Sequence, residues 1–400
     1  MNAIKADLPV YGGYVMAREE GVIFIKGAIP GELVEVSVKE KKKDYSIAEV
    51  TSILEPSSFR VNPPCRYFGS CGGCQMQYIS YEKQVSMKGE VLSDCLRRIG
   101  GTGLALSSAI TGKNFKYRMR GQFKLSGDGR IGFYREGTRD IVDIEECPLM
   151  ADEINAAYKK LRSVPLEGVR EVHITLGDCL TALVLGRGFD EGLSGSLISE
   201  GFAGVAFEDG SYSGSGYVSL ELSGLSYTVS PWSFFQSNWA LNREVVKLIV
   251  EETGNAPGNR CLDMYAGAGN FSLPLASAFS EVVAVEENAH AIKDGMRNAS
   301  INGIKNFKYA KGSAEKAKLE GAFDLMVLDP PRPGLTKETL SRVKEIAPQR
   351  IIYVSCNPAT FARDLKKLKD AYHIESVRLI DFFPNTYHIE SITFLRKNPS

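Results

Sequence analysis

Cys356 is a lone thiol at a position where a chemical role is possible. The apolar run 351–354 precedes it, and Pro358 prevents that run from continuing as a strand. A residue at the point where a buried strand opens into a loop faces the ligand crevice of an α/β sheet. Unpaired cysteines are more often small core residues than reactive groups. The position alone therefore leaves two interpretations open, a core cysteine and a nucleophile.

A second group of thiols has the spacing of a metal site. Cys65, Cys71 and Cys74 follow the pattern C-x5-C-x2-C in the stretch CRYFGSCGGC, where glycines leave the backbone free to wrap a metal. A fourth ligand could come from Cys147, which lies in the stretch EECPLM. Four thiolates suit zinc and an iron–sulfur cluster equally well on spacing alone, so the metal stays open at this point.

The composition is that of an ordinary globular protein. Apolar residues make up 44% of the 400 residues and charged residues 24%, and the formal net charge is zero. A nucleic-acid surface must therefore come from local clustering of charge. No apolar run is long enough for a signal peptide or a membrane span, so we expect a cytoplasmic monomer without membrane contact. There, cysteines are seldom disulfides, and we expect the isolated ones to be core residues: Cys95, Cys179 and Cys261.

Three regions must position these side chains. Residues 1–57 contain short strands between Gly and Pro turns, a pattern typical of a small OB-like β-barrel. Residues 58–225 are irregular, mixed α+β, and hold the cysteine group. From residue 226 onward, units of strand, glycine loop and helix repeat. We therefore predict an α/β protein whose C-terminal region, 226–400, is a doubly wound Rossmann-like domain with ligands at the carboxyl ends of its strands.

The stretch FKYRMRGQFKLSGDGRIGFYREGTRD, residues 115–140, interleaves basic and aromatic side chains. Cations neutralise phosphates and aromatic faces stack on unpaired bases, so the stretch favours contact with single-stranded RNA, with Arg118 and Arg120 as candidate contacts. Alternating strands produce the same pattern without a ligand. The charged run KEKKKD, residues 39–44, fits a solvated hairpin tip and an RNA contact equally well.

A cofactor site is predicted at the first two strands of the C-terminal region. Gly267 and Gly269, followed by Asn270, form a tight loop between strand and helix. Glu286 ends the next strand, where a carboxylate can accept both ribose hydroxyls of a nucleoside. The third glycine of a dinucleotide fingerprint is missing, so S-adenosylmethionine is a better candidate than NAD.

The loop LDPPRPG limits which methylation reactions are possible. Amino-group methylases of adenine or cytosine favour an aromatic residue after the two prolines, where this chain has Arg332, and the second cysteine of cytosine-5 enzymes is also missing. Methylation of uracil C5 remains. It requires a thiolate that adds to C6 and a base that later removes the C5 proton. Cys356 could supply the thiolate, and His388 and Glu390 are two candidate bases near the C-terminus.

Three stretches together, VSCNPATFARD, DPPRPG and FPNTYHIES, strongly resemble the RNA (uracil-5-)-methyltransferase family of bacterial rRNA and tRNA enzymes. The resemblance covers nearly the whole chain. Residues 4–56 resemble the TRAM domain that many members carry, and SPWSFFQSN resembles the family segment whose glutamine contacts the cofactor. The family implies methylation of uracil C5 in RNA through a covalent bond between the cysteine and C6. We take 23S rRNA as the expected substrate, with tRNA or an inactive iron–sulfur RNA-binding protein as alternatives.

The family also implies roles for individual residues. Cys356 matches the nucleophile and Glu390 the base. The resemblance favours a 4Fe–4S cluster over zinc at the four cysteines Cys65, Cys71, Cys74 and Cys147. The residues that match or adjoin the S-adenosylmethionine contacts are Gln236, Tyr265, Gly267, Asn270, Glu286 and Asp329.

Overall fold

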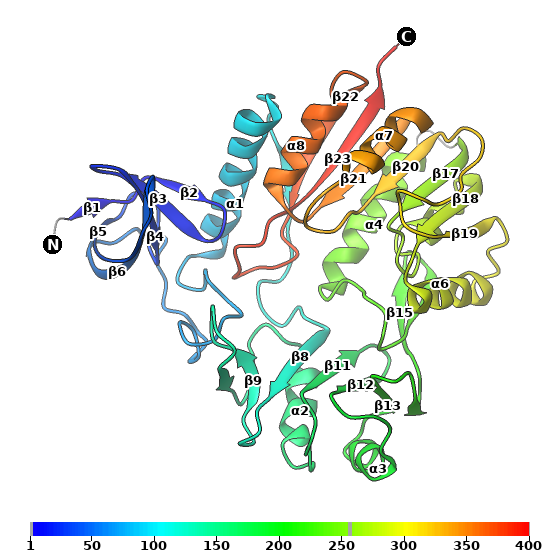
Figure 1. The fold of residues 1–400 in the computed structure, drawn as a ribbon, viewed down its shortest axis with the longest axis horizontal. Coiled ribbons are helices and arrows are strands. Elements are labelled where there is room, and N and C mark those ends of the chain that lie inside the picture. The colour runs from blue at the N-terminus through cyan, green and yellow to red at the C-terminus, as the bar shows by residue number, and fades with distance from the viewer. Residues whose placement is uncertain (1–2, 255–257, 400) are drawn as a thin grey trace.

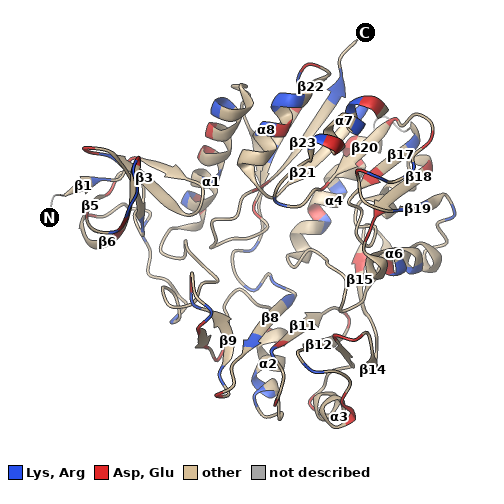
Figure 2. Ribbon diagram, in the orientation of Figure 1, with Lys and Arg blue, Asp and Glu red and all other residues tan. Residues whose placement is uncertain are grey.

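The computed structural model describes residues 3–254 and 258–399, so the outer ends of the first and third predicted regions lie outside the described residues. It consists of an N-terminal sheet, a central sheet and a large C-terminal sheet (Figure 1). Basic and acidic residues are interspersed over all three parts (Figure 2), in keeping with the formal net charge of zero. Within the described ranges, no helix has both the length and the apolar character that a bilayer crossing needs.

The N-terminal sheet is open and curled. Its six strands follow the order β1-β5-β6-β4-β3-β2, so β1 and β2 form its two edges. The strands are β1 Ile4–Lys5, β2 Leu8–Val10, β3 Tyr14–Arg18, β4 Val22–Lys26, β5 Leu33–Lys41 and β6 Tyr45–Glu55. Alternate side chains in β3 and in the first half of β5 are buried, as expected for a sheet with one solvated face. The predicted strands are present, but they form a curled half-barrel with two edges instead of a closed barrel.

Residues 81–110 do not belong to the central region to which the sequence assigned them. Helix α1, Tyr81–Cys95, continues into a π-helical turn at Leu96–Gly100 and packs on helix α8, Pro358–Leu368. Strand β7, Ser107–Ile110, pairs with β22, Tyr372–Ile380, at the edge of the C-terminal sheet. The predicted boundary was wrong because a short strand without a hydrophobic pattern gives no sign of its distant partner.

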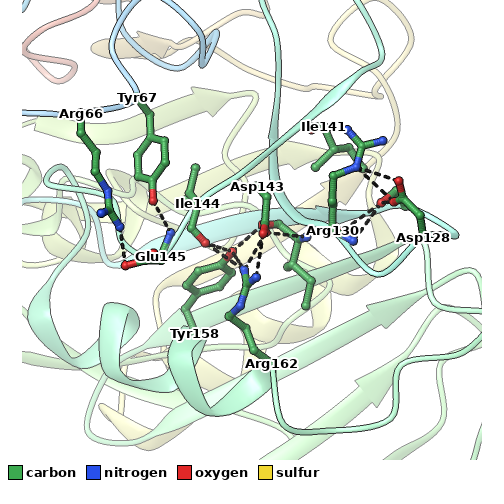
Figure 3. A network of polar contacts seen from close by, with 12 residues as sticks. Arg66, Tyr67, Asp128, Arg130, Ile141, Asp143, Ile144, Glu145, Tyr158 and Arg162 are labelled. Atoms are coloured by element: carbon green, nitrogen blue, oxygen red, sulfur yellow. Dashed lines mark hydrogen bonds and ion pairs between the residues drawn. The ribbon is translucent and has the colours of Figure 1, made fainter.

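The central sheet has seven strands in the order β10-β9-β8-β11-β12-β13-β14, covered by α2, Asp152–Leu161, and α3, Glu191–Ser199. Its strands are β8 Arg120–Leu125, β9 Ile131–Tyr134, β10 Ile141–Asp143, β11 Glu171–Leu176, β12 Leu180–Leu185, β13 Gly204–Phe207 and β14 Tyr212–Gly214. Figure 3 shows how α2 is fixed to the sheet: Arg162 binds Asp143, and the buried Tyr158 hydroxyl donates to Ile131 O or Ile144 O.

The C-terminal sheet has eight strands in the order β19-β18-β17-β20-β21-β23-β22-β7. The strands from β19 to β21 are parallel and β23 is antiparallel to both neighbours, which confirms the predicted mainly parallel sheet. They are β17 Gly258–Met264, β18 Phe279–Glu286, β19 Phe307–Lys311, β20 Leu325–Leu328, β21 Arg350–Ser355 and β23 Glu390–Lys397. The helices are α4 Trp239–Gly254, α5 Ser272–Leu275, α6 Ala289–Ile301 and α7 Lys337–Ile346, together with α8. A hairpin of β15, Val218–Leu222, and β16, Leu225–Val229, precedes α4.

A buried polar face of α6 holds the segment that leads from β16 towards the cofactor side. Asn298 accepts hydrogen bonds from the Thr228 amide and hydroxyl, both at 2.8 Å. One turn earlier, Asp294 accepts from the Ser230 amide at 2.9 Å and from its hydroxyl at 2.7 Å. Because these acceptors are spaced four residues apart, they lie on one face of the helix and match alternate residues of an extended chain. These hydrogen bonds position residues 231–238, which follow directly in the chain.

Candidate active site

Several predicted site residues meet at the carboxyl edge of the C-terminal sheet. Glu286 ends β18, Asp329 follows β20 and Cys356 follows β21. The strand order reverses between β17 and β20, which are adjacent although β18 and β19 lie between them in the chain. Such a reversal opens a crevice at the carboxyl ends of the strands. The fold thus brings three residues from three different strands to the place where an α/β sheet binds ligands.

Cys356 and Glu390 come from two neighbouring antiparallel strands. The register pairs Ser355 of β21 with Ser391 of β23. One step further along both strands are Cys356 and Glu390, so they start out from directly opposed backbone positions. The two side chains affect each other: burial raises the pKa of the Cys356 thiol to about 11, and the Glu390 and Asp329 carboxylates add to the rise. The thiol and the carboxyl group therefore belong to one site.

Glu390 suits a general base better than His388 does. Glu390 is only 6% exposed, and burial, followed by Asp329 and Asp381, raises its pKa to about 8. Burial, together with the Arg332 guanidinium 3.4 Å from Nδ1, lowers the pKa of His388 to about 4. A base works best when its pKa is near the operating pH, so the environment favours the carboxylate.

The glycine loop and Glu286 are joined by hydrogen bonds at the carboxyl edge of the sheet. The Glu286 carboxylate accepts hydrogen bonds from the amides of Gly267 at 2.9 Å and Asn288 at 2.8 Å, which fixes its orientation. Tyr265 and Gly267 have φ values of 70° and 56°, so the loop turns back sharply beneath Glu286. At Gly269, a Cβ would lie 2.8 Å from the Leu273 side chain, and only glycine allows that approach. Gly269 therefore lets the loop pack on α5, and Gly267 leaves open space at the turn beneath Glu286.

The remaining predicted cofactor residues differ in whether their side chains already have hydrogen-bond partners within the protein. Within the described part of the chain, the buried Gln236 Oε1 has no hydrogen-bond partner, so it is a good candidate to accept a hydrogen bond from a ligand. Asn270 exchanges two hydrogen bonds with Asn242 of α4, at 2.8 and 3.0 Å, so its amide is already satisfied inside the protein. The Tyr265 hydroxyl lies 3.3 Å from Thr339 Oγ1. Gln236 is thus free to bind a cofactor, whereas Asn270 supports the loop.

All four predicted metal ligands line one cavity. Cys65, Cys71, Cys74 and Cys147 surround it, its volume is 740 Å³, and it also reaches Arg332. Burial raises the pKa of the Cys74 thiol to about 12 and that of Cys147 to about 11. Thiols in such surroundings ionise only when a cation is bound beside them.

As the side chains stand, the described residues contain no group of three or more His, Cys, Asp or Glu side chains that could hold a metal ion. The nearby Gln77 Nε2, which also lines the cavity, is buried and has no acceptor among the described residues. A sulfur-rich cluster would give this amide an acceptor, since hydrogen bonds to cluster sulfurs are common. The donor set therefore fits an iron–sulfur cluster, and the thiols would have to turn towards it.

Comparison with known proteins decides the family. Residues 217–398 match the family described as tRNA (Uracil-5-)-methyltransferase. A protein of Aquifex aeolicus described as an uncharacterized RNA methyltransferase is 36% identical, over 96% of this chain and 96% of its own length. A 23S rRNA (uracil(1939)-C(5))-methyltransferase of Photorhabdus laumondii is 32% identical, over 98% of this chain and 96% of its own length. The chain belongs to the RNA uracil-5 methyltransferase family.

This RNA (uracil-C5) methyltransferase also resembles a solved structure along its whole length. The crystal structure of the Pyrococcus abyssi tRNA (uracil-54, C5)-methyltransferase in complex with S-adenosyl-L-homocysteine is 25% identical to it, with a TM-score of 0.80. The match covers 98% of this chain and 100% of the Pyrococcus chain. The likeness therefore includes the N-terminal half-barrel and the central sheet as well as the methyltransferase sheet.

The two arginines predicted to contact RNA are half-buried and line the cavity that the four cysteines surround. Both terminal nitrogens of Arg120 donate to backbone carbonyls at 2.7 Å, to Ser233 O and Pro231 O. Arg118 lies behind the cysteine group, 5.6 Å from the Phe383 ring, and its charge opposes the rise that burial causes in the pKa of Cys74. One donor of each terminal nitrogen of Arg120 ties β8 to the segment 231–238, whereas its Nε has no partner among the described residues, so the RNA contact stays a prediction. Interleaved basic and aromatic residues cannot distinguish these two uses.

Two charged residues of the site were missed in the sequence. Lys88 of α1 and Asp381, just after β22, form an ion pair of 2.7 Å with side chains only 2% and 0% exposed. Asp381 raises the pKa of Glu390 and Lys88 lowers it, so the pair acts on the candidate base. The available signal was a lysine on the apolar stripe of a helix, next to Met87 and before Val91.

The N-terminal half-barrel also reaches the site, which the sequence did not indicate. Tyr11, in the turn between β2 and β3, contacts Tyr387 edge to face with ring centroids 5.8 Å apart. Burial raises the pKa of Tyr11, Arg332 lowers it, and Cys356 and Glu390 add to the rise. The turn itself is close to the same loop, because a Cβ at Gly13 would lie 3.3 Å from Tyr387 Cβ. The half-barrel therefore contacts the loop that leads to Glu390.

We expect the ligand-free enzyme to lose stability between about pH 4 and pH 8. Burial raises the pKa of Asp263 and Asp329 to about 7, and Glu390 titrates at about 8. A carboxyl group whose pKa is raised by folding stabilises the folded state fully below about pH 4, and this contribution is lost as the pH rises through its folded pKa. The melting temperature should therefore fall over this range, and Asp329→Asn should flatten the fall. Thermal unfolding with the exposed-residue variant Asp128→Asn as control checks this. Equal slopes in the wild type and Asp329→Asn would contradict it.

Proposed function

We propose that this chain methylates C5 of a uracil in 23S rRNA with S-adenosylmethionine, through a covalent bond between Cys356 Sγ and C6. The observation that carries this proposal is the register of β21 and β23, which sets Cys356 opposite the buried Glu390. A thiol and a base on the same side of a pyrimidine are what this chemistry requires. Relatives at about one third identity over nearly their whole length, described as 23S rRNA (uracil(1939)-C(5))-methyltransferases, support the choice of RNA.

In the first step, the Cys356 thiolate adds to C6 and the electron pair of the C5–C6 double bond moves onto C5 and O4. Two features favour the thiolate. Arg332 lowers the pKa of Cys356, and the residue lies next to the N-terminus of α8, where Asn357 caps the helix through hydrogen bonds to its side chain. The partial positive charge at a helix N-terminus stabilises a neighbouring anion. When bound, S-adenosylmethionine supplies an electrophilic methyl group on a positively charged sulfur.

Once C5 carries the methyl group, Glu390 acts. Its carboxylate takes the C5 proton, the electrons of that bond re-form the C5–C6 double bond, and the Cys356 thiolate leaves. With a pKa of about 8, Glu390 has useful basicity at neutral pH. The uracil must be turned out of any helix or stack for the thiol to reach C6, so we propose an unpaired target in a loop.

We propose that the cofactor binds at the carboxyl edge of the C-terminal sheet, to the residues that the sequence predicted. Glu286 would bind the ribose hydroxyls, Gln236 Oε1 would accept from the ammonium group, and Asp329 would lie near the methyl donor. Gly267 and Tyr265 would shape the turn beneath Glu286, and Asn270 would act through its pairing with Asn242. The homologue bound to S-adenosyl-L-homocysteine supports the cofactor.

We further propose that the four cysteines hold a 4Fe–4S cluster and that the N-terminal half-barrel is a TRAM-type RNA-binding domain. Support for the cluster is the shared cavity and the burial of the thiols. The domain division that fits the structure is a half-barrel, then a cysteine loop and α1, then a central module, with the methyltransferase sheet completed by β7. We take the working unit to be a monomer in the cytoplasm.

The test of the proposed function is methyl transfer from labelled S-adenosylmethionine to bulk RNA, followed by mapping of 5-methyluridine. RNA from a strain without this gene should accept label in its 23S rRNA, and the wild-type RNA should not. Label confined to tRNA would overturn the choice of RNA and leave the chemistry standing. Absence of label in every RNA would reject the activity.

RNA binding should depend on Arg135 more than on Arg120. Arg135 is exposed and lines the cavity that runs from the cysteines to Arg332. We expect Arg135→Gln to weaken RNA binding and to lower the slope of log affinity against log salt by roughly one, because one phosphate contact is lost. Filter binding at several salt concentrations measures the slope. Arg187→Gln, which lies outside that cavity, is the control. A slope that changes in Arg120→Gln and not in Arg135→Gln would contradict this surface.

A further inference from the structure

Asn385 is the centre of a buried junction just before the catalytic base. It is 1% exposed and adopts the left-handed conformation with a φ of 66°. Its amide donates to Gln84 Oε1 at 2.8 Å, and its Oδ1 accepts from Gln84 Nε2 at 3.1 Å. Its Nδ2 donates to Asn114 O at 2.6 Å. Its carbonyl oxygen accepts from two successive amides, those of Gln75 and Met76, both at 3.0 Å.

These two amides belong to the cysteine loop. Gln75 directly follows Cys74, and its side chain donates back to Gly72 O at 2.8 Å, inside the same loop. Gly72 in turn donates to Tyr134 O at 2.9 Å, which fastens the loop to β9. The predicted metal ligand Cys74 is therefore connected to Asn385 through a single residue, Gln75, and one backbone hydrogen bond.

The rest of the turn is held by other elements, so the cysteine loop is one of several supports. Asn238 donates to Phe382 O at 3.1 Å, Lys88 to Phe383 O at 3.0 Å, and the Tyr117 hydroxyl to Pro384 O at 3.1 Å. Four successive carbonyls, 382–385, thus each have a partner from a different segment. Glu390 follows five residues after Asn385, at the first position of β23.

We propose that Asn385 is a positioning residue through which the cysteine loop holds Glu390 opposite Cys356. This rests on the proposed function and assigns the cluster a mechanical role in it: ligation fixes residues 65–77, and their amides fix the turn that carries the base. The methyl transfer needs no change of oxidation state, so no electron has to pass between the two sites. The cluster then stabilises the turn 382–389, which precedes Glu390, in addition to the cysteine loop 65–77 that binds it.

Hydrogen exchange separates this role from a purely local one. The full chain is compared with its cluster intact and after anaerobic removal of iron by a chelator, without RNA. We expect amides in residues 383–389 to exchange at least about tenfold faster without iron, while those in β17 and β18 stay unchanged. Faster exchange confined to residues 65–77 would overturn the proposal. The readout does not use activity, so it can succeed even if the proposed methylation fails.

Removal of iron could speed up hydrogen exchange throughout the protein. A variant that keeps its cluster is therefore needed to test the role of Asn385. Asn385→Gly keeps the left-handed conformation and the carbonyl that accepts from Gln75 and Met76, and removes both side-chain hydrogen bonds, so it tests whether Asn385 holds the turn. We expect unchanged iron content, faster exchange at 383–389, and a kcat on RNA lowered at least about tenfold with the KM for S-adenosylmethionine unchanged. Tyr372→Phe, which removes one hydrogen bond to Pro348 O at the other end of β22, is the control and should change neither exchange at 383–389 nor kcat. Wild-type exchange and kcat in Asn385→Gly would overturn the proposal.

Discussion

Replacing Glu390 by glutamine should leave the enzyme covalently attached to a methylated RNA. Addition of the thiol and transfer of the methyl group both precede removal of the C5 proton, so only the last step needs the base. Glutamine keeps the size of the buried side chain and lacks basicity. Turnover should fall by about 10²–10⁴, the usual contribution of a general base. On a denaturing gel, the protein should move to higher mass only when RNA and S-adenosylmethionine are both present.

Two further variants separate the mechanism from the choice of base. In the double variant Cys356→Ala, Glu390→Gln, the shifted band should disappear, since no thiol remains to form the bond. His388→Gln should turn over without accumulating the band, because a group whose pKa burial lowers to about 4 is a weak base at neutral pH. If His388→Gln traps RNA and Glu390→Gln does not, the base is wrong and the covalent mechanism stands. Methylation by Cys356→Ala would reject the nucleophile altogether.

Replacing Cys147 by alanine should remove the cluster and its iron. We expect the protein purified without oxygen to be brown, with about four iron and four sulfide ions per chain, as a Cys₄-ligated 4Fe–4S centre implies. Three thiolates leave one iron without its protein ligand, so Cys147→Ala should lose most of the iron and the colour. Cys179→Ala, at a half-buried thiol outside the cavity, is the matched control. Elemental analysis that finds one zinc and no iron would contradict the cluster.

The sequence predicted the C-terminal sheet well because local signals carry it. Glycine loops, strand-end acids and apolar runs are short patterns, and each of them lies in the structure where a parallel sheet needs it. For the same reason Glu286, Asp329 and Cys356 could be assigned to one crevice before their distances were known. The half-barrel was predicted from its turns, whereas its openness depends on which strands form the edges, and no local pattern encodes that choice.

The errors came from contacts between distant parts of the chain. Arg120 has the residue type and the aromatic neighbours of an RNA contact, and no pattern in the sequence indicated that it also donates to two backbone carbonyls of residues 231–233. Residues 81–110 follow the cysteine loop in the sequence. In the structure they pack on α8 and pair with β22, near the C-terminus of the chain. Lys88 was overlooked because its partner Asp381 is far away in sequence. Patterns report what a residue can do, and only the fold reports which partner it has.

The chain leaves the methyltransferase sheet after β7 and returns to it only after the central module, and this imposes an order on folding. The Lys88–Asp381 pair joins residues 293 positions apart, so α1 must wait for the last part of the chain to be synthesised. The strands of the half-barrel lie within residues 4–55 and its core is completed by Met76, Tyr78, Ile79 and Met87, so it can fold once the start of α1 has left the ribosome. Helix α1 can pack on β2 of the half-barrel early, but the part of its apolar face that contacts α8 and β22 stays uncovered until these elements emerge. Synthesis therefore passes through a long stage with a partly exposed apolar helix, the kind of nascent chain that chaperones bind and that aggregates when they are scarce.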